Sequence, residues 1–462
     1  SIVAIEPETG EILCMVSSPD FDPRLMIGRQ RGKNHLMLQR DPMKPLLNRS
    51  IMGVYPPGST FKTAQALTFL QEGIIQTNTP AFPCAHGFNY GSLHVGCHAH
   101  GSPLPLIPAI ATSCNSYFCW GLFRMFGDRK YGSSQNAITV WKDHMVSQGF
   151  GYKLGVDLPG EKRGLIPNAQ FYDKAYRGRW NGLTVISIAI GQGEILATPL
   201  QIANLGATIA NRGHFITPHI VKEIQDEQLD SLYRVPRKTS IDRKHYEDVV
   251  TGMRAAVTGG TCRVAGAILP DVEVCGKTGT AQNRGHDHSV FMGFAPMNNP
   301  KIAIAVYVEN GGFGAVYGVP IGALMMEQYL KTVDGRVMAC LYCGDGYYEA
   351  NPEEVSRKLC AMVNKLKPDV VMCGPAFNYL GYGKMAANIA YDINQTTDIP
   401  AFAAMSKENE ETINEFKDKI HIIETPKKGG IGLNESLDGM CKLAKALVDH
   451  EDLNPITSKY CF

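Results

Sequence analysis

Ser59 and Lys62, three positions apart, are the residues of this chain best suited to covalent chemistry. No other serine in the sequence is followed by a lysine at that distance. In a helix, this spacing places both side chains on one face, about one turn apart. A lysine amine that is partly removed from water loses proton affinity and can accept the proton of a serine hydroxyl. The pair therefore predicts a serine nucleophile with a lysine as its general base.

Two further polar motifs follow this pair along the chain. In Ser113-Cys114-Asn115, the serine can relay a proton and the asparagine can hold a peptide amide. In Lys277-Thr278-Gly279-Thr280, lysine and threonine can bind a carboxylate, and glycine lets a substrate backbone approach. Chance readily supplies any one of these motifs but rarely all three in this order, so we interpret them as one site.

The residues around the motifs predict the elements that position them. Pro56-Pro57-Gly58 favours the start of a helix just before the first motif. The apolar alternation from Val272 to Cys275 predicts a strand that leads into the third motif. Residues 302–308 predict another strand, and residues 200–210 predict a helix. The first part of the chain is therefore of mixed helix and strand content.

The character of the sequence changes near Thr332. Beyond it, short apolar runs alternate with helical segments, which predicts a smaller α/β domain with a mainly parallel sheet. Strands are expected at residues 337–342, 370–373, 401–405 and 420–424, and helices at 352–365, 385–394 and 437–449. We therefore predict two domains, residues 1–332 and residues 333–462.

The composition excludes several classes of protein. The 462 residues are 44% hydrophobic and 19% charged, as in an ordinary globular protein of two or three domains. A formal net charge of +1 gives no electrostatic reason to expect nucleic-acid binding. We see no membrane-spanning run and no signal peptide, and we expect a chain that is trimmed at its start. The 13 cysteines favour metal ligation or reduced core thiols over a disulfide framework.

Together, the three motifs resemble the signature of penicillin-binding proteins and class A β-lactamases. Residues 1 to about 332 resemble the transpeptidase domain of an elongation-type class B penicillin-binding protein. Further landmarks of that family are residues 4–13, 157–161, 187–194 and 198–201. The resemblance implies an α+β penicilloyl-serine transferase fold, in which an antiparallel sheet has flanking helices and an all-helical lobe.

The resemblance also implies a role for the residues of the first two motifs. Ser59 attacks the D-alanyl carbonyl of a peptidoglycan stem peptide and forms an acyl-enzyme, with Lys62 as general base. Ser113 passes the proton to the departing D-alanine, and Asn115 orients the donor peptide. An amine of a second stem peptide then resolves the ester and makes a cross-link. A β-lactam antibiotic enters the same route and stays bound.

For the third motif, the resemblance implies binding rather than proton transfer. Lys277 and Thr278 bind the terminal carboxylate, and Gly279 leaves room for the donor backbone. The backbone N–H groups of Ser59 and Thr280 form the oxyanion hole. No cofactor is required for this catalysis. Members of the family are anchored in the inner membrane and act outside the cytoplasm, where an N-terminal region recruits a membrane glycan polymerase.

Three other functions remain open at this point. A class A β-lactamase needs a glutamate placed over the acyl bond, for which we find no convincing match. A non-catalytic penicillin sensor would keep Ser59 and Lys62 without cross-linking. A subunit fragment of an amino-acid reductase would take the C-terminal part as the defining one.

A cluster of cysteines and histidines surrounds the second motif. Cys97-His98-Ala99-His100 has a spacing suited to a metal. Some elongation-type members of the family are similar here and hold a metal beside the second motif. Transferred by position, this resemblance implies a structural zinc with these ligands: Cys84, Cys97, His100 and Cys114. The alternative is a set of buried thiols and solvent-facing histidines.

The C-terminal part resembles a different family. Four stretches in residues 333–462 look like an N-terminal fragment of component B of glycine, sarcosine and betaine reductases: residues 339–348, 373–378, 381–383 and 424–426. The redox residues of that enzyme lie outside the matched part, so we expect no catalysis here. The reductase is cytoplasmic, whereas transpeptidation is extracytoplasmic. We therefore hypothesise an artificial or misassembled join near residues 331–335.

Overall fold

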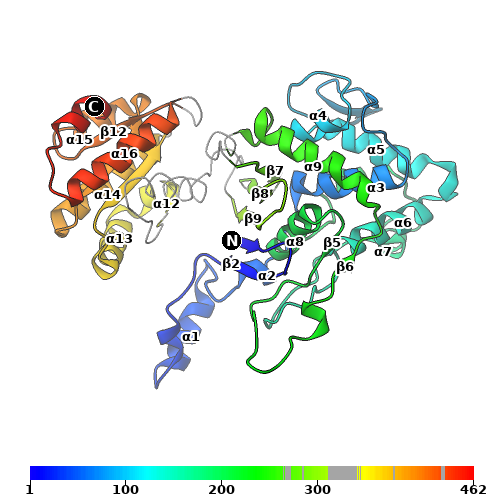
Figure 1. The fold of residues 1–462 in the computed structure, drawn as a ribbon, viewed down its shortest axis with the longest axis horizontal. Coiled ribbons are helices and arrows are strands. Elements are labelled where there is room, and N and C mark those ends of the chain that lie inside the picture. Colours follow the sequence, from blue (N-terminus) through cyan, green and yellow to red (C-terminus); the bar gives the residue numbers. More distant parts are fainter. Residues whose placement is uncertain are drawn as a thin grey trace. The chain divides into compact units, whose positions relative to one another are not determined.

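The computed structural model describes residues 1–263, 265, 272–282, 286–310, 341, 343, 345–377, 380–427 and 432–462. It divides the chain into two compact units, Ser1–Tyr317 and Gly318–Phe462 (Figure 1). The predicted boundary between residues 332 and 333 and the proposed join lie outside the described residues, and so does the strand expected at residues 337–342 except for Leu341. Each unit is considered by itself below.

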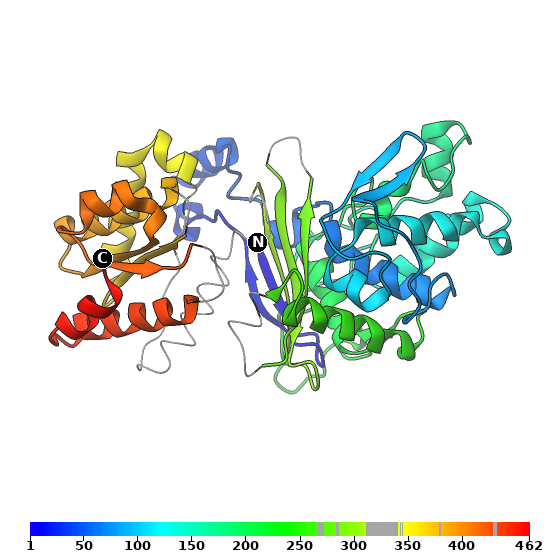
Figure 2. The ribbon, with the colours of Figure 1, turned by 90° about the horizontal axis from the view of Figure 1, so that it is seen from above.

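The first unit is built on an antiparallel sheet of five strands in the order β2-β1-β9-β8-β7. The strands are β1 (Ile2–Ile5), β2 (Ile12–Val16), β7 (Cys275–Ala281), β8 (His288–Ala295) and β9 (Ile302–Val308). Figure 2 shows the blue strands from the start of the chain in one sheet with the green strands from much later in it. Strand β7, which carries the third motif, lies at one edge of this sheet.

Two long helices pack on the sheet of the first unit. Helix α8 (Pro199–Ala210) contacts β1, β8 and β9, and every one of its residues is buried. It begins with a capping box between Thr198 and Gln201 and with proline in the first turn, as helix starts commonly do. Helix α9 (Arg243–Thr258) packs one apolar face against β7. These contacts hold the strand that carries the third motif.

A helical lobe lies beside the sheet and carries the other two motifs. Its elements are α3 (Lys62–Gln71), α4 (Leu106–Ala111), α5 (Asn115–Gly127), α6 (Ser134–Ser147), α7 (Ala169–Tyr176) and the hairpin of β3 (Gly87–Tyr90) and β4 (Leu93–Gly96). In α3, every residue except Gln71 is buried, which is typical of a helix inside a core. The sheet with helices and a helical lobe agrees with the prediction for this part.

Shorter elements complete the first unit. They are α1 (Arg31–Arg40), α2 (Arg49–Met52), β5 (His214–Phe215), β6 (Arg237–Lys238) and the 3₁₀ helices η1 (Pro23–Met26), η2 (Gly58–Phe61), η3 (Arg129–Tyr131), η4 (Ile186–Ile190) and η5 (Ser231–Tyr233). Within the described residues of the chain, no helix combines the length and hydrophobicity needed to cross a membrane.

The second unit contains a parallel sheet in the order β10-β11-β12. Its strands are β10 (Val371–Ala376), β11 (Ala401–Ser406) and β12 (Ile422–Thr425), and its helices are α12 (Asp345–Ala350), α13 (Pro352–Leu366), α14 (Leu380–Thr396), η6 (Lys407–Asn409), α15 (Glu410–Phe416), α16 (Leu433–Val448) and α17 (Asn454–Tyr460). All six residues of β11 are buried, as expected of a parallel strand covered on both faces.

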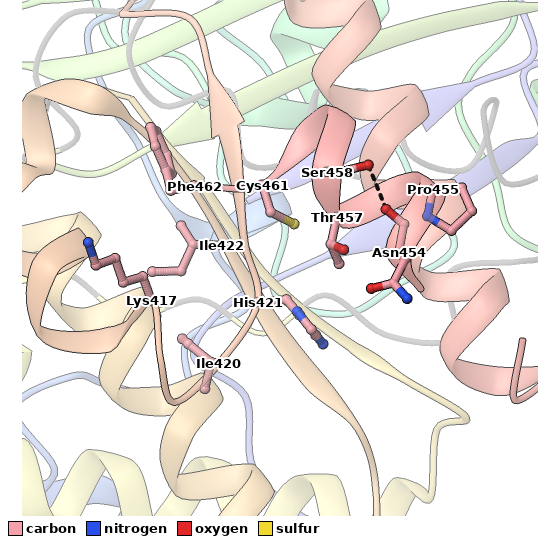
Figure 3. Close-up of a pocket in the computed structure, with 10 residues that line it drawn as sticks. All are labelled: Lys417, Ile420, His421, Ile422, Asn454, Pro455, Thr457, Ser458, Cys461 and Phe462. Carbon is pink, nitrogen blue, oxygen red and sulfur yellow. Dashed lines mark hydrogen bonds between the residues drawn. The ribbon is translucent and has the colours of Figure 1, made fainter. Parts of the chain in front are cut away.

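A pocket of about 750 Å³ lies beside β12 in the second unit (Figure 3). Its lining residues are Lys417, Ile420, His421, Ile422, Asn454, Pro455, Thr457, Ser458, Cys461 and Phe462. Burial lowers the pKa of His421 and raises the pKa of Cys461 to about 11. The thiol of Cys461 is therefore protonated at neutral pH and is a poor nucleophile. None of the lining residues belongs to the three motifs.

Candidate active site

The first motif lies where the 3₁₀ helix η2 continues into α3. Ser59 is the second residue of η2, and Lys62 is the first residue of α3. Because a 3₁₀ helix has three residues per turn, the two positions lie above one another. Gly58 before them has a φ of 56°, and a Cβ atom there would lie 3.0 Å from the carbonyl oxygen of Thr280. Only glycine fits this position without strain.

The amine of Lys62 is fully buried and points toward the second motif. Its Nζ donates to the carbonyl oxygen of Ser113 at 2.7 Å, to Oδ1 of Asn115 at 2.5 Å and to Oγ of Ser113 at 3.2 Å. Burial lowers the pKa of Lys62 to about 8. Within the described residues, the hydroxyl of Ser59 forms no hydrogen bond. Catalytic hydrogen bonds often tighten only when substrate binds.

Ser113 lies in the turn between α4 and α5 and has a φ of 58°. Such a left-handed conformation is uncommon for a serine and costs energy, which the surrounding structure must offset. It places Oγ between two cations, since Lys277 donates to the same oxygen at 2.8 Å. Asn115 begins α5, and its Nδ2 donates to the carbonyl oxygen of Gly96 at 2.7 Å. Both ends of the Asn115 amide are therefore engaged.

Lys277 on β7 is the second fully buried amine of the site. Burial and the nearby charge of Lys62 lower its pKa to about 7. Two ammonium groups that share one hydroxyl oxygen repel each other, and the pair must be treated as coupled. One of the two amines is therefore readily deprotonated near neutral pH and can serve as a base.

The rest of the third motif runs directly past the nucleophile. A Cβ atom on Gly279 would lie 3.3 Å from the backbone nitrogen of Ser59, so glycine allows the close approach. The hydroxyl of Thr278 donates to Oγ1 of Thr261 at 2.9 Å. The carbonyl oxygen of Thr280 accepts a hydrogen bond from Nε2 of Gln192 at 3.2 Å. The structure thus brings the residues of all three motifs together.

Sequence reasoning missed two side chains that contact the third motif. Thr261, in the turn after α9, also donates its backbone N–H to the carbonyl oxygen of Ala111 at 3.1 Å. It therefore links the third motif to the helix before the second. Gln192 lies within the family landmark at residues 187–194. A glycine on each side of Gln192, and two glycines before Thr261, are the sequence signal that tight turns occur there.

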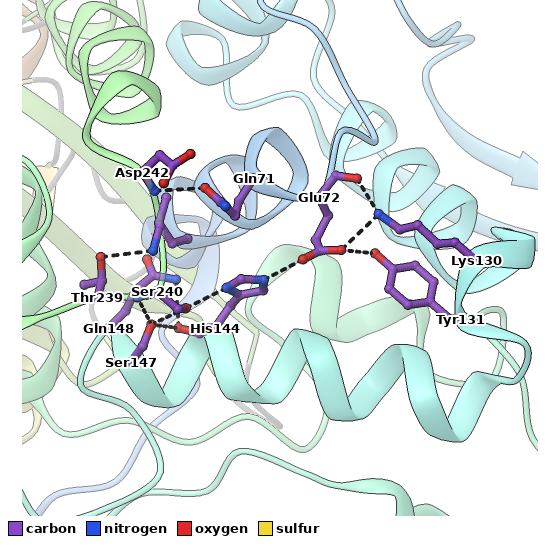
Figure 4. Close-up of polar contacts among 11 residues, drawn as sticks. Gln71, Glu72, Lys130, Tyr131, His144, Ser147, Gln148, Thr239, Ser240 and Asp242 are labelled. Atoms are coloured by element: carbon purple, nitrogen blue, oxygen red, sulfur yellow. Dashed lines mark hydrogen bonds and ion pairs between the residues drawn. The ribbon is translucent and has the colours of Figure 1, made fainter.

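The far end of α3 is held by a polar network around Glu72 (Figure 4). Its carboxylate accepts hydrogen bonds from Tyr131 at 2.6 Å and from His144 at 2.8 Å, and it lies 2.9 Å from the amine of Lys130. Burial by itself raises the pKa of Glu72, but the hydrogen bonds from these three residues lower it to about 2. Glu72 is therefore ionised throughout the neutral range.

The same network reaches the loop before α9. His144 Nδ1 lies 2.7 Å from Oγ of Ser240, and Ser240 Oγ lies 2.9 Å from Oγ of Ser147. The backbone N–H of Asp242 donates to Oε1 of Gln71 at 2.8 Å (Figure 4). Since α9 packs on β7, this network ties the helix of the first motif to the support of the third.

The four predicted metal ligands lie together beside the second motif. Their ligand atoms, from Cys84, Cys97, His100 and Cys114, all lie within 4.8 Å of one another. The hairpin of β3 and β4 brings the first two cysteines together, and Cys114 is the N-cap residue of α5. Three thiols and one imidazole form a donor set typical of structural zinc.

The surroundings of the four residues also fit a metal. His100 has its Nδ1 2.7 Å from the carbonyl oxygen of Gly101, which leaves Nε2 as the free donor atom. Nε2 lies 3.3 Å from Sγ of Cys97. Hydrogen bonds from Cys114 and His100 lower the pKa of Cys97 to about 4, so this thiol is readily ionised. Sγ of Cys97 also accepts the backbone N–H of Asn115 at 3.1 Å, which links the cluster to the second motif.

Comparison with known proteins matches the two parts of the chain to two families. The penicillin binding protein transpeptidase domain matches residues 1–327. The glycine/sarcosine/betaine reductase selenoprotein B family matches residues 315–461. A curated relative, peptidoglycan D,D-transpeptidase MrdA of Acinetobacter baumannii, is 36% identical over 338 residues, which cover 68% of this chain and 48% of that protein. The chain thus spans about half the length of the curated relatives it matches.

Solved structures are similar over the same part of the chain. Pseudomonas aeruginosa PBP2 in complex with WCK 5153 has a TM-score of 0.61 and 34% identity, and the match covers 73% of this chain and 75% of that one. A structure of a peptidoglycan synthase complex that coordinates polymerization and crosslinking has a TM-score of 0.62 and 31% identity, over 73% and 56%. These neighbours support the penicilloyl-serine transferase fold. Since the family match covers well over half of its residues, the chain belongs to the penicillin-binding protein transpeptidase family.

Proposed function

We propose that residues 1–332 act as a peptidoglycan D,D-transpeptidase domain that works through an acyl-Ser59 intermediate. The observation that supports it best is the hydrogen-bonded set of Lys62, Ser113 and Lys277 beside Ser59, formed by residues far apart in the sequence. A buried amine with a lowered pKa is the base that a serine nucleophile needs. The match to transpeptidases of this family supports the same reaction.

The first half-reaction forms the ester. Neutral Lys62 takes the proton of the Ser59 hydroxyl, and Oγ bonds to the D-alanyl carbonyl carbon of the donor stem peptide. The peptide C–N bond then breaks, and the proton returns through Ser113 to the amine of the departing D-alanine. In this step, Lys62 turns from its contacts with Ser113 and Asn115 toward Ser59, one turn away. The second half-reaction transfers the acyl group to the amine of an acceptor stem peptide and restores Ser59.

The remaining motif residues bind and polarise the donor. The charge of Lys62 is one cause of the lowered pKa of Lys277, so Lys277 holds its proton more firmly once Lys62 is neutral. In that state Lys277 supplies a positive charge, and Thr278 a hydroxyl, for the terminal carboxylate. The backbone N–H groups of Ser59 and Thr280 form the oxyanion hole, and Gly279 admits the donor backbone. Asn115 orients the donor amide, for which its amide must exchange its contact with Gly96 or Lys62 for one with substrate.

Labelling with a fluorescent penicillin tests this proposal. The chain is expected to become labelled at Ser59, and the Ser59→Ala variant is expected to remain unlabelled. Equal labelling of both would overturn the proposal. A cross-linking assay with lipid-linked glycan strands separates the enzyme from a penicillin sensor, which would be labelled without forming cross-links. Rapid release of hydrolysed penicillin would point to a β-lactamase.

We further propose a structural zinc ion at Cys84, Cys97, His100 and Cys114. The fit of the donor set and the bond from the Asn115 N–H to Sγ of Cys97 support it. A bound zinc ion would supply charge neutralisation for the thiolates and fix the start of α5. About one equivalent of zinc per chain is expected in the purified protein, and less than a tenth of an equivalent in Cys97→Ser. Absence of stoichiometric metal from both would remove the proposal.

The location and partners of the domain are also proposals. We propose that it works outside the cytoplasmic membrane, on stem peptides supplied by a membrane glycan polymerase, and that β-lactams acylate it.

For residues 333–462 we propose no activity, and we propose that the two parts meet at an artificial or misassembled join near residues 331–335. The same join found as one open reading frame in independently sequenced DNA would defeat that idea.

A further inference from the structure

One short turn of the first unit touches both sides of the candidate active site. It consists of Gly191 and Gln192 and follows the 3₁₀ helix η4. Neither residue belongs to the three motifs. The carbonyl oxygen of Gly191 accepts the backbone N–H of Gly58, which precedes Ser59, at 2.9 Å. The side chain of Gln192 donates to the carbonyl oxygen of Thr280 on β7 at 3.2 Å.

Gly191 packs against the turn of Gly58 and Ser59, called the nucleophile turn below, and this contact leaves no room for a side chain at position 191. Its φ is 71°, in the region that favours glycine. A Cβ atom there would lie 2.2 Å from the carbonyl oxygen of Gly58 and 2.8 Å from the side chain of Phe61. The turn therefore fits closely against the backbone that carries Ser59.

The contact with β7 shows which way Thr280 faces. In a strand, the N–H and C=O groups of one residue point to the same side. The Thr280 carbonyl is bonded to Gln192 and lies 3.0 Å from a Cβ built on Gly58, so it faces the nucleophile turn rather than the neighbouring strand β8. The N–H of Thr280 consequently faces the same side, toward Ser59.

The turn itself is fixed to the core of the helical lobe. Buried Gln65 of α3 donates from Nε2 to the carbonyl oxygen of Ile188 in η4 at 2.8 Å. The indole of Trp141 donates to Oε1 of Gln65 at 2.8 Å. Gln192 itself is half-buried, and its backbone N–H donates to the carbonyl oxygen of Ser187 at 3.1 Å. A fixed turn of this kind can hold β7 at a constant distance from the nucleophile.

We propose that Gln192 is a positioning residue that sets the oxyanion hole by holding the Thr280 edge of β7 against the Ser59 turn. This inference rests on the proposed acyl-enzyme chemistry. Gln192 does not touch the reacting atoms and acts through the Thr280 peptide. We expect substrate binding to change little, because Lys277 and Thr278 have partners of their own in Ser113 and Thr261.

The test compares Gln192→Leu with the unchanged chain in acylation by penicillin. Leucine keeps much of the volume and removes the donor. We expect the rate constant of acylation to fall about 10- to 100-fold. This decrease is no larger than the decrease caused by removing an oxyanion-hole donor itself, which is about 10²- to 10³-fold. The dissociation constant of the complex formed before acylation should change less than about twofold, because the effect lies in the transition state.

A spectroscopic measurement distinguishes positioning from a loss of packing. The ester carbonyl of the acyl-enzyme absorbs at lower infrared frequency when the oxyanion hole donates to it. Its band should move to higher frequency and broaden in Gln192→Leu. The matched control is Gln170→Leu, at an exposed position of α7, which should leave both the rate and the band unchanged. Gln192→Glu is a second variant, which keeps the shape but places a carboxylate oxygen against the Thr280 carbonyl oxygen. It should show the same slower acylation and the same shift of the band.

The outcomes separate this inference from the function on which it rests. Normal acylation of the unchanged chain, with rate and band equal in Gln192→Leu and in the control, overturns only the role of Gln192. A weaker pre-acylation complex with an unchanged acylation rate also overturns it. Failure of the unchanged chain to acylate at Ser59 overturns both. If Gln192→Leu does not fold, the same two readouts on Gln192→Glu decide the matter.

Discussion

The two ends of helix α3 hold ionisable groups in opposite ways. At the start of the helix, the amine of Lys62 shares Ser113 with a second cation, Lys277, and its pKa is lowered to about 8. At the other end, the carboxylate of Glu72 is surrounded by donors, and its pKa is lowered to about 2. Lys62, at the start of the helix, therefore releases its proton easily, whereas Glu72, at the other end, stays ionised over the whole neutral pH range.

The difference follows from what surrounds each group. Burial disfavours a charge, and partners of opposite sign or hydrogen bonds to the charged form can reverse that effect, from donors for an anion and from acceptors for a cation. Lys62 donates to neutral oxygens, and burial outweighs the nearby cysteine thiols that act to raise its pKa. The pKa of Lys62 therefore falls, and the neutral amine is favoured. Glu72 meets three donors, and these outweigh burial. The helix thus joins a reactive end, suited to proton transfer, to an anchored end, suited to stability.

The largest expected effect is at the reactive end. Lys62→Met, which keeps the length of the side chain and removes the amine, should slow acylation of Ser59 by about 10³-fold, within the range of general-base catalysis. The second-order rate constant for penicillin labelling measures this effect. Labelling within about tenfold of the unchanged chain would exclude Lys62 as the base. Methionine fits the buried position but leaves the Ser113 carbonyl and Oδ1 of Asn115 without this donor, so thermal unfolding of the variant is measured alongside.

Changing the pH should affect the two ends in separate ranges. The base is active when neutral, so acylation should rise with pH through about 8 and fall about tenfold per unit below it, as far as one protonation controls the rate. Glu72 has a folded pKa below its ordinary value of 4.5, so its contribution to stability is complete above pH 4.5. That contribution is lost as the pH falls from 4.5 toward 2.

Two measurements over the same buffers check this prediction. One is the rate of penicillin acylation, and the other is the midpoint of thermal unfolding. The acylation rate should vary between pH 6 and 9, where ionised Glu72 contributes a constant stability. A rate that is flat from about pH 6 to 9 would contradict the lowered pKa of Lys62.

Glu72→Gln should weaken the anchored end by a smaller amount. The amide keeps the shape but loses the charge that accepts from Tyr131, His144 and Lys130, and about 1–3 kcal/mol of stability should be lost. Urea unfolding measures the change. Glu227→Gln, at an exposed position of the same unit, is the matched control and should change stability by less than about 0.5 kcal/mol. Equal stability of the two variants would show that the network contributes nothing.

The smallest effect should come from Ser240→Ala, which removes one partner of His144 and leaves Glu72 in place. Ser147 still donates to the backbone carbonyl oxygen of His144, and solvent can reach the exposed Ser240. A loss of about 0.5–1.5 kcal/mol is expected, the net value of one hydrogen bond. A loss as large as that of Glu72→Gln would show that the histidine, rather than the carboxylate, organises the anchored end.

Local patterns were sufficient to predict many of the elements. The alternating apolar residues predicted at 302–308 form β9 with those bounds, and the helix expected at 352–365 is α13 (Pro352–Leu366). The strand expected at 420–424 begins later, at Ile422, since its first two residues belong to the connection after α15. The expected gathering of Cys84, Cys97, His100 and Cys114 is confirmed, while the zinc ion remains a prediction.

The geometry of the candidate site could not be read from the sequence. The spacing predicts that Ser59 and Lys62 share one face of a helix, but it does not predict that the Lys62 amine donates to Ser113 and Asn115. That direction depends on how α5 and β7 approach α3, which no local pattern encodes. For the same reason, Glu72 and His144, 72 positions apart, gave no signal of their network. The roles of the individual motif residues remain predictions.

The position of β7 at the edge of its sheet has one more consequence. A free strand edge is normally a liability, because it can pair with any other extended chain. Here the free side of Thr280 faces the Ser59 turn, and Gln192 covers part of it. An incoming peptide that extended the sheet along this edge would be recognised through its backbone, and its side chains would matter only where they point into the protein. The same edge that could cause aggregation can therefore select an extended chain end while tolerating variation in its side chains.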